Sequence, residues 1–281
     1  MKKRVIFSFI FIPLILFIPA LFIIPKFHDP LTVTSYTLDF KKLPSKFDGF
    51  KILVLADLHG HLFGEKQEEL INVILGEAPD IIVCPGDLMD KNNSDMTSIR
   101  LLLEGISGKF PIYMVPGNHD YVTTKRFDEL LQLIRHEHGV VFSDGRTMRV
   151  RREDQMIVLT SLKLLEYKPE NPYSIDVCPP PVYKDEFNIL MHHFGNEFDI
   201  LSDEYDLVLA GHVHGGLFRL FGKGLVNAST KNPFFPKYSK GVYRKKSGSV
   251  MVLSAGLGDT FLPRFNNPRE IVVITLRVLS E

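Results

Sequence analysis

The sequence predicts an α/β fold in which polar side chains gather at the carboxyl ends of several strands. Short apolar runs typical of buried strands alternate with segments of helical periodicity in the first half of the chain. Five apolar runs end in polar clusters: Asp57-Leu58-His59, Gly86-Asp87, Gly117-Asn118-His119-Asp120, His192-His193 and Gly211-His212-Val213-His214-Gly215-Gly216. Because α/β sheets bind ligands at the carboxyl ends of their strands, we expect these clusters to meet at one site.

The apolar patterns place the individual elements. Strands are expected at residues 32–40, 52–56, 81–84, 111–115, near 140, 147–151, 156–161, 187–191 and 207–210. Helices are expected at 65–76, 97–107 and 124–138. No helix separates the strands between 140 and 161, and a second sheet is expected to begin there. Residues 163–184 and 216–241 are expected to form long loops, which inside a compact domain are often functional.

The polar clusters predict a centre that binds two metal ions. Two divalent ions that lie close together need about seven or eight nitrogen and oxygen ligands, one of them shared. The clusters supply Asp57, His59, Asp87, Asn118, His193, His212 and His214. Carboxylate, amide and imidazole without cysteine suit Mn, Fe or Zn better than an iron–sulfur site. Asp87 has no competing ligand in its cluster, so it is the expected bridge between the ions.

The order of these motifs resembles the calcineurin-like metallophosphoesterase superfamily. The resemblance extends from about residue 34 to 276 and includes residues 263–271, which look like the membrane-associated bacterial branch of predicted phosphoesterases. It implies a four-layer α/β/β/α sandwich with two divalent metals at the strand ends, manganese being favoured. It also implies how the ligands divide between the ions: Asp57, His59 and His214 for one, and Asn118, His193 and His212 for the other.

The resemblance implies hydrolysis of a phosphoester or pyrophosphate bond by a metal-bound hydroxide. His119 is expected to protonate the leaving group or stabilise its developing charge, and Asp120 to orient the His119 imidazole. A related branch hydrolyses a UDP-linked diacylglucosamine lipid, which makes a lipid-linked substrate the specific candidate. A nuclease of the same superfamily and a metal-stabilised binding scaffold without turnover remain as alternatives. The chain after residue 26 carries 29 basic and 33 acidic residues, which argues against nucleic acid as a partner.

Three site positions stay open on the sequence alone. His192 and His193 compete for one ligand position, because neighbouring residues of a strand face opposite ways; the family pattern favours His193. His61 is expected to be a solvated loop histidine rather than a substrate contact. Gly117, Gly211, Gly215 and Gly216 are expected to permit tight turns and a close approach of the backbone. For Gly117 and Gly211 the alternative is that they only mark turns.

The N-terminus predicts a membrane anchor over residues 1–26, followed by one catalytic domain over residues 27–281. Residues 5–25 contain no charge and, as a helix, would span roughly 31 Å, the thickness of a bilayer core. A cleaved signal peptide is the alternative, although the run is long for one and lacks an A-x-A site. Three basic residues before the run favour a single-pass protein of the cell membrane with its domain outside the cytoplasm, while several lysines beyond it weaken that orientation.

The loop at 216–241 carries four phenylalanines: Phe218, Phe221, Phe234 and Phe235. Two arrangements are open for them. With Lys231, Lys237 and Lys240 they form a lip that meets lipid, or they pack beneath the loop. A disulfide between Cys84 and Cys178 is not expected, because Cys84 lies on a predicted buried strand.

Overall fold

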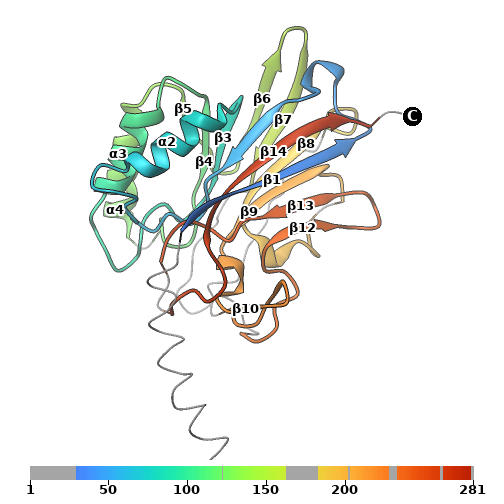
Figure 1. The fold of residues 1–281 in the computed structure, drawn as a ribbon. Helices are drawn as coiled ribbons and strands as arrows, with labels where there is room; N and C mark the ends of the chain where they lie inside the picture. Colours follow the sequence, from blue (N-terminus) through green and yellow to red (C-terminus); the bar gives the residue numbers. More distant parts are fainter. Residues whose placement is uncertain are drawn as a thin grey trace, which may run out of the picture.

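Two six-stranded sheets pack face to face in the protein (Figure 1). The computed structural model describes residues 30–121, 123–162, 183–201, 203–227, 233–259 and 262–279. The first sheet has the order β1 (Leu31–Phe40), β14 (Arg269–Val278), β2 (Lys51–Val54), β3 (Ile81–Pro85), β4 (Ile112–Val115), β5 (Val140–Phe142). The second has the order β12 (Gly241–Arg244), β13 (Val250–Leu253), β9 (Leu207–Gly211), β8 (Asn188–Phe194), β7 (Gln155–Ser161), β6 (Thr147–Arg152).

The strand directions bring the ends of the central strands together. In the first sheet β2 to β5 are parallel, and β14 runs antiparallel to β2 but parallel to β1. In the second sheet β13, β9, β8 and β7 are parallel, with antiparallel edge strands β12 and β6. The carboxyl ends of parallel neighbours share one edge of a sheet, so each sheet presents a single edge for polar side chains.

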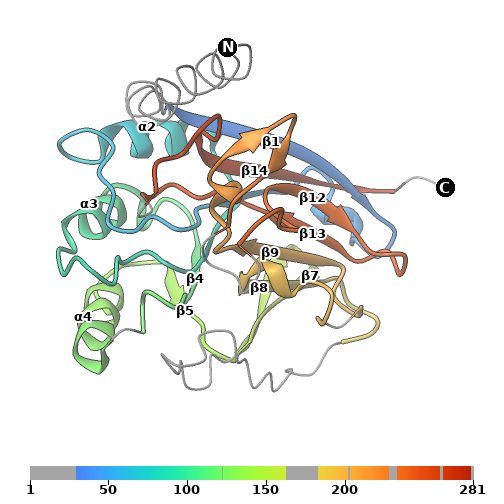
Figure 2. The same ribbon diagram turned by 90° about the horizontal axis from the view of Figure 1, so that it is seen from below.

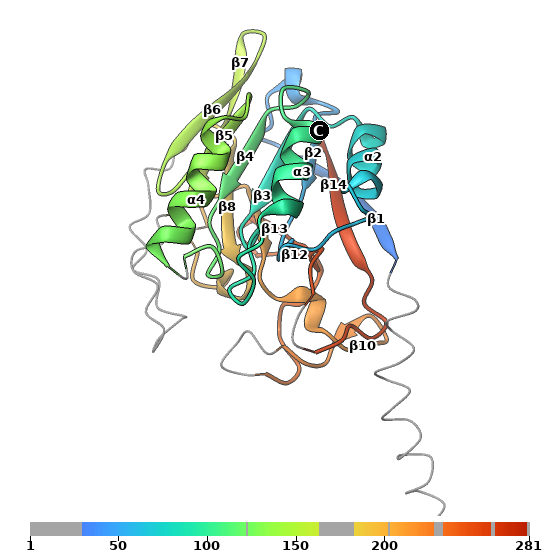
Figure 3. The same cartoon turned by 90° about the vertical axis from the view of Figure 1, so that its left-hand side faces the viewer.

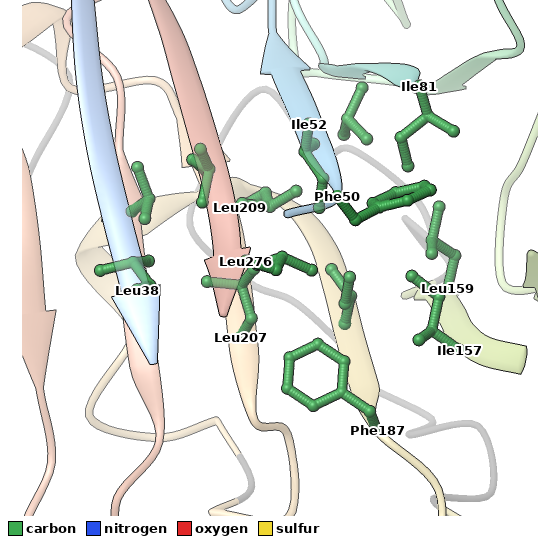
Figure 4. Packing of buried hydrophobic residues seen from close by; sticks show 14 of the residues in the cluster. Leu38, Phe50, Ile52, Ile81, Ile157, Leu159, Phe187, Leu207, Leu209 and Leu276 are labelled. Carbon is green, nitrogen blue, oxygen red and sulfur yellow. The ribbon is translucent and has the colours of Figure 1, made fainter. Parts of the chain in front are cut away.

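The main core lies between the two sheets (Figure 4). Leu38 and Leu276 of the first sheet pack there with Leu207 and Leu209 of the second. Residues 52–54 of β2 are buried on both faces, which is why their sequence is continuously apolar rather than alternating.

Three α-helices of the described chain cover the outer face of the first sheet (Figure 3). They are α2 (Glu68–Glu77), α3 (Thr97–Ile106) and α4 (Thr124–Arg135). Leu53 of β2 and Ile82 of β3 point toward these helices and pack in a second apolar cluster with Leu70 and Ile99. This gives the α/β/β part of the expected sandwich.

In the described part of the chain, the outer face of the second sheet is covered by irregular segments rather than by α-helices. Val208 and Met251 pack there against Phe198 and Tyr205, which belong to the segment around the 3₁₀ turn η2 (Gly195–Glu197). In Figure 2 the helices lie together on the other side of the sheets. The expected fourth, helical layer is therefore not seen in the described residues, which do not include 163–182.

The predicted strands and helices are otherwise confirmed, with small changes at their ends. Helix α2 begins at Glu68 rather than 65, and α4 ends at Arg135 rather than 138. The predicted membrane anchor and Cys178 lie outside the described residues. Within the described part of the chain, no helix combines the length and apolar character needed to cross a bilayer.

Candidate metal centre

The seven predicted ligands come together at the edge where the central strands end. Three groups of side chains can each hold a metal ion, because within each group the ligand atoms all lie within 4.8 Å of one another. The groups are Asp57, His59 and His214; His59, Asp87 and His119; and Asp87, His193 and His212. The first and third groups match the expected division of ligands between two ions.

Asp87, directly after β3, faces both halves of the cluster. Its Oδ2 lies 3.7 Å from His59 Nε2 and 3.2 Å from His193 Nε2. On the first side, His59 Nε2 is 3.2 Å from His214 Nε2. This is the position that a bridging carboxylate requires.

The second half of the cluster converges on His193. Its Nε2 lies 3.0 Å from Asn118 Oδ1 and 3.1 Å from His212 Nδ1. One ring nitrogen cannot form good hydrogen bonds with a carboxylate, an amide oxygen and a second imidazole at once, whereas a cation can be coordinated by all of these groups together. The donor set and its convergence therefore fit a divalent metal ion.

The backbone is strained at most of these positions. Five of the seven predicted ligands have positive φ: Asp57 at 52°, His59 at 47°, Asp87 at 54°, His212 at 75° and His214 at 48°. A non-glycine residue in this region costs of order 1–3 kcal/mol and persists only where its surroundings hold it there. This backbone conformation turns the ligand side chains toward one another shortly after each strand ends.

Gly117 and Gly211 permit close packing against ligand carboxylates. A Cβ on Gly117 would lie 2.2 Å from Asp87 Oδ1, and one on Gly211 would lie 2.5 Å from Asp57 Oδ2. Neither glycine has a positive φ. Of the two expectations for these glycines, the structure supports the close approach of the backbone.

A break in the pairing of β8 with β9 separates the two neighbouring histidines. The register shifts between Met191 and Phe194, as in a β-bulge, which can re-aim side chains. His193 donates from Nδ1 to the carbonyl of Pro85 at 2.9 Å, which leaves Nε2 for the cluster. His192 turns away and pairs with Glu197 at 2.9 Å. A backbone carbonyl behind the imidazole is typical of metal-ligating histidines, so the structure supports His193 over His192.

His119 lies at the rim of the cluster, with 19% of its side chain exposed. Its ring packs edge-on against His59 at 4.5 Å between centroids. Its Nδ1 accepts a hydrogen bond from the amide of Lys91 at 3.3 Å and lies 3.9 Å from Asp90 Oδ1. Burial lowers the pKa of His119. The imidazole is thus neutral near pH 7, with its proton on Nε2.

Asp120 has a different role from the one expected. Its carboxylate accepts the backbone N–H groups of Asp87 and Gly117 at 2.8 Å and that of Met89 at 3.0 Å. In the part of the chain that the structure describes, the hydrogen-bond partners of this carboxylate are backbone amides, and Asp90 is the carboxylate near His119. Asp120 therefore ties together the loops after β3 and β4 rather than orienting the imidazole.

Burial and neighbouring charges set the protonation of the cluster. Burial raises the pKa of Asp57 to about 7 and lowers that of His59 to about 4. Burial, and then His59 and Arg264, hold the pKa of His214 well below its usual range. Burial opposes the charge of His193, but Asp87 raises its pKa to about 9. His59 and His214 are consequently neutral at pH 7, the state in which imidazole binds metals.

Arg264 is a component of the site that the sequence did not assign. Its guanidinium is buried, and Nη2 lies 3.4 Å from His214 Nδ1. The carbonyls of Ala255 and Gly258 hold it at 2.8 and 2.9 Å. Arg264 lies in the stretch 263–271 that contributed to the family resemblance, but one arginine there does not reveal its burial.

His61 lies outside the cluster, on the loop surface. Its Nδ1 is 3.0 Å from Asp259 Oδ2, and Asp259 also pairs with Arg269. The hydrogen bond from His61 holds the pKa of Asp259 well below its usual range, and Arg269 adds to this effect. His61 is thus partly exposed, as expected, but it is paired.

Comparison with known proteins agrees with this geometry. Residues 50–216 match the family described as Calcineurin-like phosphoesterase, a span that contains all seven predicted ligands. The chain therefore belongs to this family, which is a class of metal-dependent hydrolases acting on phosphoric esters.

Several relatives align over most of the chain. An uncharacterized metallophosphoesterase of Aquifex aeolicus is 26% identical over 266 residues, 88% of this chain and 92% of the relative. The uncharacterized metallophosphoesterase YkuE of Bacillus subtilis is 27% identical over 257 residues, 88% of this chain and 86% of the relative. A transmembrane protein with metallophosphoesterase domain from Danio rerio is 28% identical over 265 residues, 89% of this chain but 58% of that protein.

Among solved structures, a dimetal phosphatase from Danio rerio is similar, with a TM-score of 0.45 and 13% identity. The alignment covers 74% of this chain and 88% of that one.

Proposed function

We propose that the protein is a dinuclear metal-dependent phosphoesterase that hydrolyses a phosphoester or pyrophosphate bond. The observation that carries this proposal is the position of Asp87, whose carboxylate faces His59 on one side and His193 on the other. Asp57, His59 and His214 would hold one ion with Asp87, and Asn118, His193 and His212 would hold the other, manganese being the favoured metal. Ions bound there supply a Lewis acid for the phosphoryl oxygens and lower the pKa of water toward neutrality.

The residues around the ions have separate tasks. His119 is placed at the open side of the cluster with its proton on Nε2, so it can donate to the leaving oxygen or stabilise the charge that develops there. The Lys91 amide and Asp90 hold the other side of the ring. Asp120 holds the backbones of Asp87 and Gly117 together, so that the Asp87 carboxylate faces both halves of the metal cluster.

The test uses the full chain, stripped of metal and reloaded with Mn²⁺, and assayed on p-nitrophenyl and bis-p-nitrophenyl phosphate. We expect Asp87→Asn to lose both bound metal and turnover. We expect His119→Asn to keep its metal while turnover falls by about 10²- to 10⁴-fold. His136→Asn, an exposed histidine at the end of α4, is the matched control and should behave as the wild type.

Two results would contradict the proposal. A wild-type protein that binds two metals and hydrolyses neither ester would favour the binding-scaffold alternative. Unchanged turnover in His119→Asn would remove His119 from the mechanism. The ratio of monoester to diester hydrolysis would narrow the substrate class.

A lipid-linked substrate such as UDP-diacylglucosamine is the finer part of the proposal, together with a single-pass location in the cell membrane. Its motivation is the uncharged run at residues 5–25 and the exposed phenylalanines of the loop after β9. The relatives from Danio rerio and Bos taurus that are named transmembrane proteins are consistent with such a location. Equal efficiency on a short soluble phosphodiester and on its diacyl counterpart would contradict the lipid-linked substrate.

A further inference from the structure

Three phenylalanines project from the surface near the metal centre. Phe221 is 99% exposed, Phe235 76% and Phe234 67%. The fourth phenylalanine of the loop, Phe218, instead stacks on Phe265 at 6.1 Å between ring centroids. Packing beneath the loop therefore describes Phe218 only, and the other three form what we call the aromatic face.

The aromatic face is one continuous piece of structure. Phe221 lies in the turn of the hairpin formed by β10 (Arg219–Leu220) and β11 (Lys223–Gly224). Phe234 pairs with Val226 in a β-bridge, and the amide of Phe235 donates to the carbonyl of Leu225 at 2.8 Å. The chain that follows β11 thus brings Phe234 and Phe235 alongside the hairpin.

Neither the core nor the backbone explains these residues. Phe221 has a φ of 50° and Phe235 a φ of 52°, a region that a bulky side chain rarely adopts. Glycine or asparagine would fit both turns with less strain. Large apolar groups that are strained and turned toward solvent are typical of surfaces that contact a partner or a membrane.

The local charge favours an anionic bilayer as the partner. The hairpin and the segment that follows it, residues 219–240, contain five Lys or Arg and no Asp or Glu. Two of them are paired with acids from other segments, Lys237 with Asp199 and Lys240 with Glu270. Lys223 is exposed on the hairpin beside Phe221. Basic residues are attracted to the negative surface of anionic lipids, and aromatic rings settle at the boundary between headgroups and acyl chains.

The aromatic face lies at the end of the molecule where β1 begins. Thr32, at the start of β1, donates from Oγ1 to the carbonyl of Arg269 at 2.9 Å, and Asn266 donates from Nδ2 to the carbonyl of Arg219 at 3.2 Å. The start of β1 and β10 therefore lie at the same end of the molecule (Figures 1 and 3). In the sequence, the uncharged residues 5–25 precede β1.

We propose that the aromatic face is a membrane-contact surface that inserts its rings into the interface of an anionic bilayer. The hairpin is fastened to the metal-binding loop, because Arg219 Nη1 donates to the carbonyl of Gly215 at 2.6 Å and Gly216 abuts Gly224. Contact through this face sets the metal centre at the level of the lipid headgroups. The surface does not depend on the reaction proposed above, and its test measures lipid contact rather than turnover.

The chain contains no tryptophan, so a single introduced tryptophan reports on one position. The full chain is incorporated into vesicles of phosphatidylcholine and phosphatidylglycerol, with or without bromine on the acyl chains. In the Phe221→Trp and Phe235→Trp variants we expect the tryptophan to emit at a shorter wavelength than a solvent-exposed tryptophan. We also expect brominated lipid to quench most of its fluorescence. The control is Val141→Trp, which replaces an exposed residue of β5 at the opposite edge of the first sheet from β1. It should keep the emission of a solvent-exposed ring and resist quenching.

Three outcomes would overturn the proposal. The first is that Phe221→Trp and Phe235→Trp stay unquenched although the protein co-sediments with the vesicles. The second is that Val141→Trp is quenched to the same degree, which would mean that lipid contact is not specific to this face. The third is a shift to shorter wavelength that is insensitive to bromine and grows with protein concentration, which would assign the face to a second copy of the chain.

Discussion

Replacing Asp120 separates a structural role of this carboxylate from a chemical one. Its two oxygens accept three buried backbone amides, those of Asp87, Met89 and Gly117. A hydrogen bond to a charged group contributes about 1.5–3 kcal/mol. The loss of unfolding free energy on removing the carboxylate should be smaller than the sum of three such bonds, because the loops can relax around the gap. In addition, burial, together with Asp87, raises the pKa of Asp120 to about 7 and so opposes the charge that strengthens these bonds. We expect Asp120→Ala to lose about 4 kcal/mol of unfolding free energy.

Asp120→Asn should give an intermediate result. The oxygen that accepts from both Asp87 and Gly117 can be kept as the amide oxygen, while the amide nitrogen faces the Met89 N–H and loses that bond. The expected loss is about 1–2 kcal/mol. Urea unfolding monitored by circular dichroism measures both values, and metal analysis shows whether the loops still bind metal. The comparison variant is Asp90→Asn, which changes the carboxylate near His119 and should leave unfolding nearly unchanged.

The reasoning would be refuted if Asp120→Ala unfolded like the wild type while its turnover per bound metal fell by orders of magnitude. Asp120 would then act on the chemistry, as the sequence first suggested. Lower stability and lower metal content, with normal turnover per bound metal, would support the role assigned by the structure.

Three further predictions follow from particular contacts. Gly117→Ala should weaken metal binding by about 10- to 100-fold, because the added Cβ would lie 2.2 Å from Asp87 Oδ1. Gly76→Ala in α2, where an added Cβ has nothing within 4 Å, should bind metal normally, and isothermal titration calorimetry compares the two variants. His193→Ala should lose bound metal, whereas His192→Ala should keep it. His192→Ala should instead lose about 1–3 kcal/mol of unfolding free energy, because it removes the side chain that pairs with buried Glu197. Loss of metal in His192→Ala but not in His193→Ala would reverse the assignment of the ligand. Asp259→Asn should be less stable than the wild type by about 0.5–1 kcal/mol near neutral pH. Because the folded pKa of Asp259 is depressed by His61, this difference should shrink as the pH falls below about 4, and a pH-independent difference in urea unfolding would contradict the ion pair.

Local patterns in the sequence were sufficient to predict most of the site. Each ligand lies within a few residues of the end of an apolar run, and the parallel arrangement of strands brings such ends to one edge, so Asp57, Asp87 and His212 could be expected to meet. The choice between His192 and His193 needed the bulge in β8, which is a property of pairing with β9.

The features that escaped prediction depend on distant parts of the chain. Nothing local to Asp120 shows that three amides converge on its carboxylate, and nothing local to Arg264 shows that it is buried against His214. The packing of Phe198 and Tyr205 on the second sheet likewise depends on how irregular segments fold back over the sheet.

The pairing of β1 with β14 has a consequence for synthesis of the protein. In the described sheet β1 is an edge strand hydrogen-bonded to β14, and Thr32 is separated from its partner Arg269 by 237 positions. At a translation rate of about 5–20 residues per second, β1 waits for roughly 10–50 s before its neighbour exists. All seven predicted ligands leave the ribosome earlier than β14, which must then enter between β1 and β2. Closure of the first sheet, rather than delivery of the ligands, is therefore the step that a nascent chain reaches last.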